Sequence, residues 1–320
     1  ENAEVRNCTV SGFGRGIRID GGRANRVLDN VASSNLRYGI EFSGATTANL
    51  VQGNLVESTG DEGIHVGTAA DDNRIVANVS RGNAAENLYV LASSRVVATG
   101  NVLENPGPGK ASLFVKNSSW GTYSGNRVQG LVHFRGDSHD NAFDTTESVG
   151  RGFRFEAWQE NDTPWGFPHD NRVEGGTITG ADVCFAFVGA YRNIAAHVVA
   201  TGCLPVSQSP AGGQEAVENV VQICGDGVLA GDESCDAGIG NGNAGSCCSG
   251  SCSITTGSVC RPAASGCDAA EVCDGLSGTC PADGFASAGT ACAPDALPCS
   301  DDVCNGSGSC THPPSAAGTI

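Results

Sequence analysis

The chain contains a histidine beside acidic residues in the stretch EGIHVG, residues 62–67, which directly follows Asp61. Imidazole and carboxylate side chains are the commonest proton carriers in enzymes. His65, Asp61 and Glu41, which lies one repeat earlier, are therefore candidate catalytic residues. A half-exposed strand shows the same alternation of aliphatic and polar residues without any catalysis. The elements that position these residues must decide between the two interpretations.

The stretch around His65 recurs through the first part of the chain. From Ile17, its first apolar position returns at residues 40, 64, 88 and 113, at intervals of 23, 24, 24 and 25 residues. Apolar and variable residues alternate within each copy, which is the period of a half-buried strand. The copies read GIRI (16–19), GIEF (39–42), GIHV (63–66), NLYV (87–90), SLFV (112–115), LVHF (131–134), GFRF (152–155) and CFAF (184–187).

A set of asparagines keeps the same period. Asparagine tolerates left-handed backbone, and its amide can bond to the turns above and below, so the set predicts a stack at one corner of a coiled sheet. Three short strands per turn, stacked about 4.8 Å apart, predict an all-β, right-handed parallel β-helix of about nine turns over residues 1–220. The set is Asn7, Asn30, Asn54, Asn78, Asn101 and Asn126.

The combined NxVxxN and GIxV cadence resembles the parallel β-helix repeats of the pectin-lyase-like superfamily, especially its carbohydrate-binding and sugar-hydrolysing members. The resemblance implies that the outer face of the GIxV strands carries substrate. TGDEGIHV (59–66) is similar to the acidic strand motif of polygalacturonase-like hydrolases, but the sequence has no second acidic motif, Gly-His-Gly, Arg-x-Lys or Asp-Pro-His-Asp signature. Because the chain begins within the pattern, we also expect further turns before residue 1.

Residues between the inward-facing aliphatics of each copy must face outward. They form one column that could follow an extended polysaccharide or cell-surface glycan, because Arg, His and Glu bind hydroxyl groups and Tyr stacks on sugar rings. Solvent-facing alternation alone would also produce such a column. The candidate substrate-binding residues are Arg18, Glu41, His65, Tyr89, His133 and Arg154, in a column that also contains Phe114 and Ala186.

The period breaks once, where the stretch EAWQENDTPWGFPHDNRV (156–173) separates Phe153 from Phe185 by 32 residues. Long loops on rigid scaffolds often carry binding residues, and Trp is a common platform for sugars. Trp158 and Trp165 are therefore further candidate substrate-binding residues. A loop folded over the β-helix, with both indoles shielding its core, is the alternative.

The cysteines and charges divide the chain in two. Three of the sixteen cysteines (Cys8, Cys184 and Cys203) precede residue 222, and thirteen follow it. Such a framework predicts an oxidising compartment, extracellular or at the cell surface. Residues 223–320 contain eleven acidic residues and one basic residue, within a net charge of −17. This charge argues against nucleic acid as a partner, and no apolar run is long enough to insert into a membrane as a helix.

From residue 223 the spacing of Cys, Gly and acidic residues resembles a shortened disintegrin domain and the Cys-rich repeats appended to secreted bacterial proteins. We expect a Cys-rich module over residues 223–292 and a further repeat over residues 293–320, because VCDGLSGTC (272–280) recurs as VCNGSGSC (303–310). The odd number of tail cysteines leaves at least one without a partner inside the tail. A protein partner that binds through this tail is a further expectation.

Clustered carboxylates in a small domain repel one another unless a cation lies between them, which predicts structural Ca²⁺ in the tail. The resemblance to the disintegrin domain implies two ligand sets, with solvated turn residues as the alternative for both. The first set is Asp226, Glu233 and Asp236, and the second is Asp268, Glu271 and Asp283.

Three functions fit these patterns. The first is a secreted or cell-surface protein that binds extended polysaccharide and has a Ca²⁺-stabilised tail. The second is a polysaccharide lyase, hydrolase or epimerase that uses the same outer face. The third is a purely structural stalk. The incomplete catalytic motifs favour binding over catalysis.

Overall fold

The chain is described by a computed structural model over residues 1–144, 146–161, 163–229, 233–295, 297 and 299–315. It divides into two compact units, Glu1–Ile223 and Cys224–Ile320. Within the described residues, no helix has both the length and the apolar character needed to cross a membrane.

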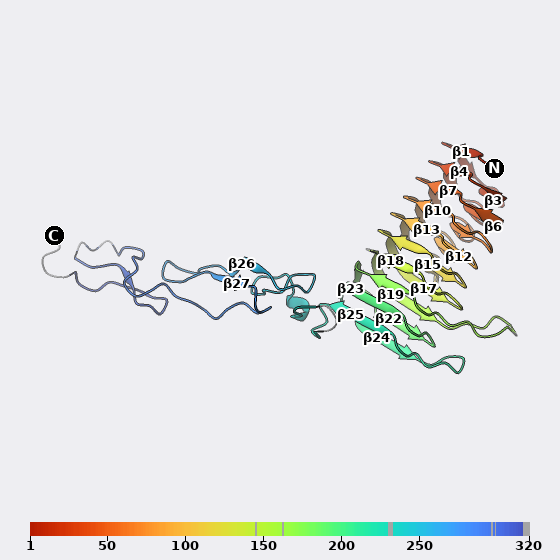
Figure 1. The fold of residues 1–320 in the computed structure, drawn as a ribbon. Helices are drawn as coiled ribbons and strands as arrows, with labels where there is room; N and C mark the ends of the chain where they lie inside the picture. Colours follow the sequence, from red (N-terminus) through yellow and green to blue (C-terminus); the bar gives the residue numbers. More distant parts are fainter. Residues whose placement is uncertain (145, 162, 230–232, 296, 298, 316–320) are drawn as a thin grey trace. The chain divides into compact units, whose positions relative to one another are not determined.

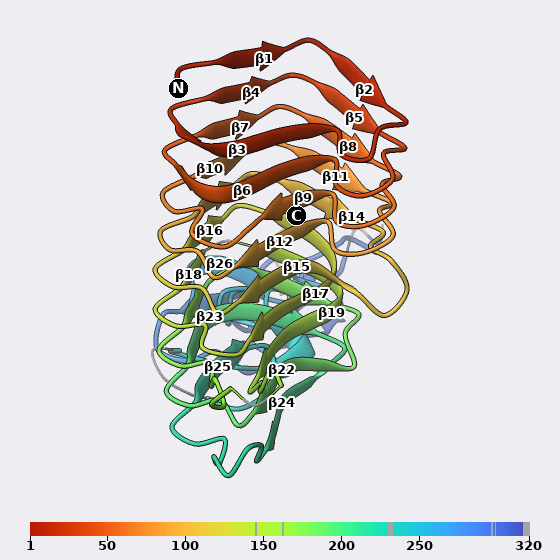
Figure 2. The ribbon, with the colours of Figure 1, turned by 90° about the vertical axis from the view of Figure 1, so that its right-hand side faces the viewer.

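The first unit is a parallel β-helix whose turns contribute strands to three stacked columns (Figure 1 and Figure 2). The first column contains the GIxV strands: β3 (Ile17–Arg23), β6 (Ile40–Thr47), β9 (Ile64–Val66), β12 (Leu88–Leu91), β15 (Ala111–Lys116), β17 (Arg127–Arg135), β19 (Glu147–Glu156), β22 (Val183–Val188) and β24 (Leu204–Ser209). The second column contains β1 (Glu4–Arg6), β4 (Arg26–Leu28), β7 (Leu50–Gln52), β10 (Arg74–Val76), β13 (Val97–Thr99), β16 (Thr122–Ser124), β18 (Ala142–Asp144), β20 (Arg172–Glu174), β23 (Ile194–Thr201) and β25 (Val220–Cys224). The third column contains β2 (Thr9–Ser11), β5 (Val31–Ser33), β8 (Leu55–Glu57), β11 (Val79–Arg81), β14 (Val102–Glu104), the first parts of β17 and β19, β21 (Thr177–Thr179) and the end of β23.

The first column keeps the predicted register. Ile17 pairs with Ile40, and Ile40 pairs with Ile64, in parallel strands. Ile40, Ile64 and Leu88 are fully buried in one continuous apolar core. The nine strands of this column confirm the predicted all-β parallel solenoid of about nine turns.

The glycine that begins each early GIxV copy is required by close packing at the turn. A Cβ atom at Gly39 would collide with a side-chain methyl group of Val56, and one at Gly63 would collide with the hydroxyl of Ser80. Any larger residue would therefore push the first column away from the third.

Buried asparagines link successive turns, as their spacing predicts. The Oδ1 atom of Asn54 accepts hydrogen bonds from the backbone N–H of Asn30 at 2.9 Å and from its side-chain amide at 3.0 Å. Asn54 makes the same two bonds to Asn78, both at 2.9 Å. The ladder satisfies backbone groups at a corner where no strand can do so.

The last turns are tied together by aromatic packing and one disulfide. Phe134 stacks on Phe155 at 4.5 Å between ring centroids, and Phe155 stacks on Phe187 at 5.1 Å, inside the core. Cys184 of β22 bonds to Cys203, which directly precedes β24. This disulfide joins neighbouring turns because β22 pairs with β24.

The second unit contains little regular structure. Its elements are the 3₁₀ helix η1 (Gly238–Gly240) and the antiparallel strand pairs β26 (Thr256–Arg261) with β27 (Glu271–Asp274) and β28 (Val303–Cys304) with β29 (Cys310–Thr311). Its six disulfides are Cys224–Cys252, Cys235–Cys248, Cys247–Cys273, Cys260–Cys280, Cys267–Cys304 and Cys292–Cys310. So many disulfides indicate an extracellular or periplasmic protein, because reducing compartments do not maintain them.

Candidate functional site

The structure aligns the predicted outward residues in one column along the first sheet. Arg18 pairs with Glu41, Glu41 with His65, and His65 with Tyr89. The column continues through Phe114, His133, Arg154 and Ala186. One face therefore carries the candidate substrate-binding residues of the first column at one per turn.

The aromatic rings of this column stack on one another. The centroids of Tyr89 and Phe114 lie 5.0 Å apart with 16° between the ring planes, and those of Phe114 and His133 lie 4.8 Å apart with 12°. Tyr38 stacks on His65 in the same way at 4.5 Å. Stacking along the column leaves ring edges facing outward. A sugar stacks on an open ring face, so these rings offer little area for it.

Three carboxylates lie beside the upper part of the column. Glu62 Oε1 is 3.8 Å from His65 Nδ1, and the Glu62 side chain is 11% exposed. Burial raises the pKa of Glu62, but contacts with His65, the backbone and Asp61 together outweigh burial and lower the pKa. Burial and the adjacent charge of Glu62 raise the pKa of Asp61, and burial raises that of Glu86. The two neighbouring carboxyl groups therefore have pKa values shifted in opposite directions.

Glu41 has a different environment from the other two catalytic candidates. Its carboxylate lies 2.7 Å from Arg15 Nε and 3.4 Å from Arg18 Nε, and its side chain is 7% exposed. Both guanidinium groups lie against the Oε2 atom of this carboxylate and so occupy it. The geometry therefore leaves Asp61 and His65, together with Glu62, as the proton-transfer candidates.

The carboxylate of Glu156 contacts one histidine and two arginines in the later turns of the column. Its carboxylate lies 3.0 Å from His133 Nε2, 3.3 Å from Arg135 Nε and 2.7 Å from an Arg154 guanidinium nitrogen. The contact with His133, together with Arg154, lowers the pKa of Glu156 to about 2 although burial opposes the shift. Burial lowers the pKa of His133, so the imidazole is favoured in its neutral form.

Glu156→Gln is expected to remove part of the acid sensitivity of the β-helix. The pKa of Glu156 is about 2 when folded, against an ordinary value of 4.5, so its ionised form stabilises the fold above about pH 4.5 and this contribution disappears as the pH falls toward 2. The variant should be less stable at pH 7 and lose less stability between pH 4.5 and 2. Urea unfolding over that range measures the effect. Asp20→Asn, at a side chain that is 65% exposed, is the control, and equal slopes in all three proteins would contradict the prediction.

The loop after β19 forms an open pocket of about 730 Å³. Hydrogen bonds between the backbones of Trp158 and Gly166, at 2.9 and 2.8 Å, close the loop at its neck. The indole of Trp165 is 40% exposed. The lining consists of Asn117, Asp137, Trp158, Glu160, Asn161, Thr163, Pro164, Trp165, Gly166, Phe167 and Tyr191.

Trp158 connects this pocket to the outward column. The guanidinium of Arg135 lies 3.6 Å from the Trp158 ring centroid and 5.9 Å from that of Phe114. The Nε1 atom of Trp158 is buried and has no hydrogen-bond partner among the described residues. Lys116, which follows the column in β15, reaches Glu160 of the loop at 2.8 Å. Column and pocket are therefore one continuous surface.

In the tail, the second predicted Ca²⁺ set surrounds an arginine. Arg261 Nε lies 2.7 Å from Glu271, and a terminal nitrogen of Arg261 lies 2.6 Å from Asp283. The negative charge of Asp268 also raises the pKa of Arg261, after the larger effect of Glu271. The three carboxylates are brought together, but a guanidinium occupies the place expected for the ion.

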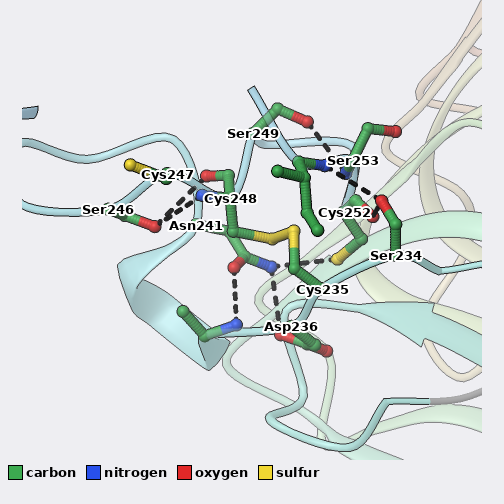
Figure 3. Close-up of a disulfide and its surroundings, with 12 residues drawn as sticks. Ser234, Cys235, Asp236, Asn241, Ser246, Cys247, Cys248, Ser249, Cys252 and Ser253 are labelled. Atoms are coloured by element: carbon green, nitrogen blue, oxygen red, sulfur yellow. Dashed lines mark hydrogen bonds between the residues drawn. A yellow bond between two sulfur atoms is a disulfide. The ribbon is translucent and has the colours of Figure 1, made fainter. Parts of the chain in front are cut away.

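In the first predicted set, Asp236 bonds to the loop around it. One carboxylate oxygen accepts from the N–H groups of Gly225 and Gly227, and the other accepts from Gly238 N–H and the amide of Asn241. Figure 3 shows this amide between Asp236 and Cys252. Four donors use the lone pairs of the carboxylate. The loop thus uses both oxygens of Asp236, whose carboxylate also lies within 4.8 Å of a carboxylate oxygen of Glu233.

Groups of three ion-binding side chains occur in the tail within the described residues. Three of these groups contain cysteines that are already bonded in disulfides. The fourth, Asp295, Asp302 and His312, places its ligand atoms within 4.8 Å of one another. The described part of the β-helix holds no such group.

Sequence patterns missed several residues of this surface. Tyr38, Glu62 and Glu86 each lie three residues before a column residue, and this offset is the signal that would have found them. Phe167 and Tyr191 join the pocket from positions outside the GIxV copies. Phe167 lies in the same loop as Trp165, but nothing in the local sequence indicates that Tyr191 joins Trp165 in the lining of the pocket.

The fold and register define a parallel β-helix. Residues 1–150 match the family described as "Periplasmic copper-binding protein (NosD)". Among curated proteins, the chain is 36% identical over 92 residues to "Disintegrin and metalloproteinase domain-containing protein unc-71" of Caenorhabditis elegans, an alignment that covers 22% of this chain and 9% of that protein.

Solved structures share the solenoid. A double mutant of the periplasmic alginate epimerase AlgG superposes with a TM-score of 0.50 at 17% identity, over 64% of this chain and 50% of that one. The A-module of the mannuronan C-5 epimerase AlgE6 of Azotobacter vinelandii gives 0.49 at 16%, over 69% and 57%. This chain thus spans about half the length of these structures. Likeness at such identities establishes the fold alone.

Proposed function

We propose that this protein is an extracellular or cell-surface protein that binds an extended polysaccharide on the pocket and the adjoining outward column. The observation that carries the proposal is the open pocket of about 730 Å³, lined by two tryptophans, a phenylalanine and a tyrosine beside amide and carboxylate groups. A partly exposed aromatic residue such as Trp165, which is 40% exposed, suits a sugar ring when polar groups lie beside it. An alginate epimerase with a similar solenoid is consistent with a polysaccharide partner.

The charge of the pocket favours a neutral glycan. Its lining contains the carboxylates of Asp137 and Glu160 and no basic residue among those described. Two cations lie at its edge, and both are already paired: Lys116 with Glu160 and Arg135 with Glu156. A polyuronate would bring further carboxylates to this surface at a Coulombic cost. We therefore expect a soluble neutral glucan to bind more tightly than alginate.

Trp165→Ala is expected to weaken glucan binding about tenfold or more, because a buried Trp anchor commonly contributes 1–2 kcal/mol or more. Affinity electrophoresis with neutral glucan and with alginate measures the effect. Trp120→Ala is the matched control, since this indole is 56% exposed and does not line the pocket. Equal affinity of both variants and the parent protein would reject the pocket as the binding site.

The alternative function is catalysis at Asp61, Glu62 and His65. The raised pKa of Asp61 and the lowered pKa of Glu62 favour it, since perturbed carboxylates often mark active sites. Assays of reducing ends and of unsaturated uronates on each glycan decide between the two functions. A rate that falls in Asp61→Asn, with binding unchanged, would establish an enzyme.

We infer that the tail balances its charge through Arg261 and backbone amides in place of the predicted Ca²⁺. Hydrogen exchange of β26 and β27 in the full chain should then be equal in 2 mM Ca²⁺ and in chelator. Arg261→Ala leaves Glu271 and Asp283 without their cation, and this variant should become Ca²⁺-dependent. Protection in the parent protein that rises with the logarithm of the Ca²⁺ concentration would instead establish a calcium site.

A further inference from the structure

The tail contains two copies of a four-cysteine repeat. The first copy has Cys260, Cys267, Cys273 and Cys280, and the second has Cys292, Cys299, Cys304 and Cys310. The first and fourth cysteines pair inside each copy, as Cys260–Cys280 and Cys292–Cys310. These disulfides close each copy on itself.

The remaining disulfides join each copy to what precedes it. Cys267, the second cysteine of the first copy, bonds to Cys304, the third cysteine of the next. Cys247, which precedes both copies, bonds in the same way to Cys273, the third cysteine of the first copy. In both disulfides the third cysteine of a copy bonds to a cysteine that lies before that copy.

Cys299 occupies the second position of the second copy and is free and exposed. Its backbone reproduces that of Cys267. The carbonyl oxygen of Cys267 accepts from Ala286 N–H at 3.0 Å, and that of Cys299 accepts from Ser315 N–H at 2.9 Å. The backbone at Cys299 is therefore held by the same kind of hydrogen bond as the backbone at Cys267, which links the two copies.

The antiparallel bridges around the two cysteines also match. Asp268, which follows Cys267, bridges to Phe285, and Ser300, which follows Cys299, bridges to Pro314. Cys267 is 1% exposed in its disulfide with Cys304. The two sites therefore share a local fold and differ in that Cys267 has a partner cysteine and Cys299 is free.

We propose that Cys299 is a linking cysteine that forms a disulfide with the third cysteine of a further, tandem copy of this repeat, in the register that joins Cys267 to Cys304. A second molecule of this chain offers no such partner, because Cys273 and Cys304 are both already bonded. Two thiols lose two protons and two electrons when the bond forms. A small disulfide such as oxidised glutathione accepts them and becomes two thiols.

The test extends the full chain with a copy of residues 292–320 joined after Ile320, oxidised in glutathione buffer. Peptide mapping without reduction should find Cys299 bonded to the third cysteine of the added copy. Maleimide labelling of Cys299 should fall at least tenfold relative to the 320-residue chain, while Cys8, the other free cysteine among the described residues, stays labelled. The matched control replaces the third cysteine of the added copy with serine, which should restore labelling of Cys299.

A second measurement does not depend on folding of the extended chain. A peptide with the sequence of residues 292–320 carries its first–fourth disulfide preformed, serine at its second cysteine, and its third cysteine as a mixed disulfide with glutathione. It should react with Cys299 of the 320-residue chain at least tenfold faster than with Cys8. Equal rates at the two thiols, unchanged labelling of Cys299 in a correctly bonded extended chain, or Cys299–Cys299 dimers would each overturn the proposal.

Discussion

Reduction of the disulfides is expected to unfold residues 224–320 at neutral pH without denaturant and to leave the β-helix folded. A buried cluster of the tail consists of Cys247, Cys260 and Cys273, whereas Leu276 is 83% exposed and Val259 58% exposed. Removing one native disulfide from a small domain costs about 2–5 kcal/mol. Six tail disulfides are lost together here, which is more than such a domain can lose and stay folded.

Hydrogen exchange before and after reduction measures this effect in the full chain. Protection should disappear in β26 and β27 and persist in β9, β12 and β15. The variant with both Cys184→Ser and Cys203→Ser is the control for the disulfide inside the β-helix, and without reductant its tail should stay protected. Tail amides that remain protected after complete reduction would contradict the prediction.

Asn78→Ala is expected to destabilise the β-helix by about 2–4 kcal/mol, because an unsatisfied buried donor costs about 1–3 kcal/mol and further bonds are lost with it. The substitution removes both acceptor contacts to Asn54, at 2.9 Å each. It also removes donation to Val51 O at 3.0 Å and to the Asn101 side chain at 3.1 Å. The backbone N–H of Asn54 is then left inside the corner without its acceptor.

Guanidinium unfolding measures the difference in free energy of unfolding. Gln52→Ala is the matched control, since Gln52 lies near the same corner in β7 and its side chain is exposed. This control should change the free energy by no more than about 0.5 kcal/mol. Equal destabilisation by the two substitutions would show that the asparagine ladder adds nothing beyond an ordinary surface amide.

The solenoid could be predicted because one physical constraint repeats on every turn. Each copy must bury the residues at the positions of Ile64 and Val66 and bond the corner at Asn78, so the sequence shows the period several times over. The register of the outward column follows from the same period. Cys184 and Cys203, about one turn apart, were predictable as a bridge for that reason.

The pocket and the tail could not be predicted to the same depth, because they depend on contacts that do not repeat. The direction of the Tyr89 and Phe114 rings is set by neighbours on adjacent turns, and alternation alone says only that they face outward. Arg261, the single basic residue after residue 222, looked incidental in sequence. Its central place among the carboxylates follows from the pairing of β26 with β27, which brings Arg261 opposite Glu271.

The loop closed by Trp158 and Gly166 leaves the pairing of the strands that flank it unchanged. Phe153 still pairs with Phe185, and Phe155 with Phe187, although 32 residues separate each pair. The pairing of the strands on both sides of the loop therefore does not depend on the length of the loop. We therefore expect that another segment can replace residues 159–165 and alter the lining of the pocket while the turns above and below keep their packing.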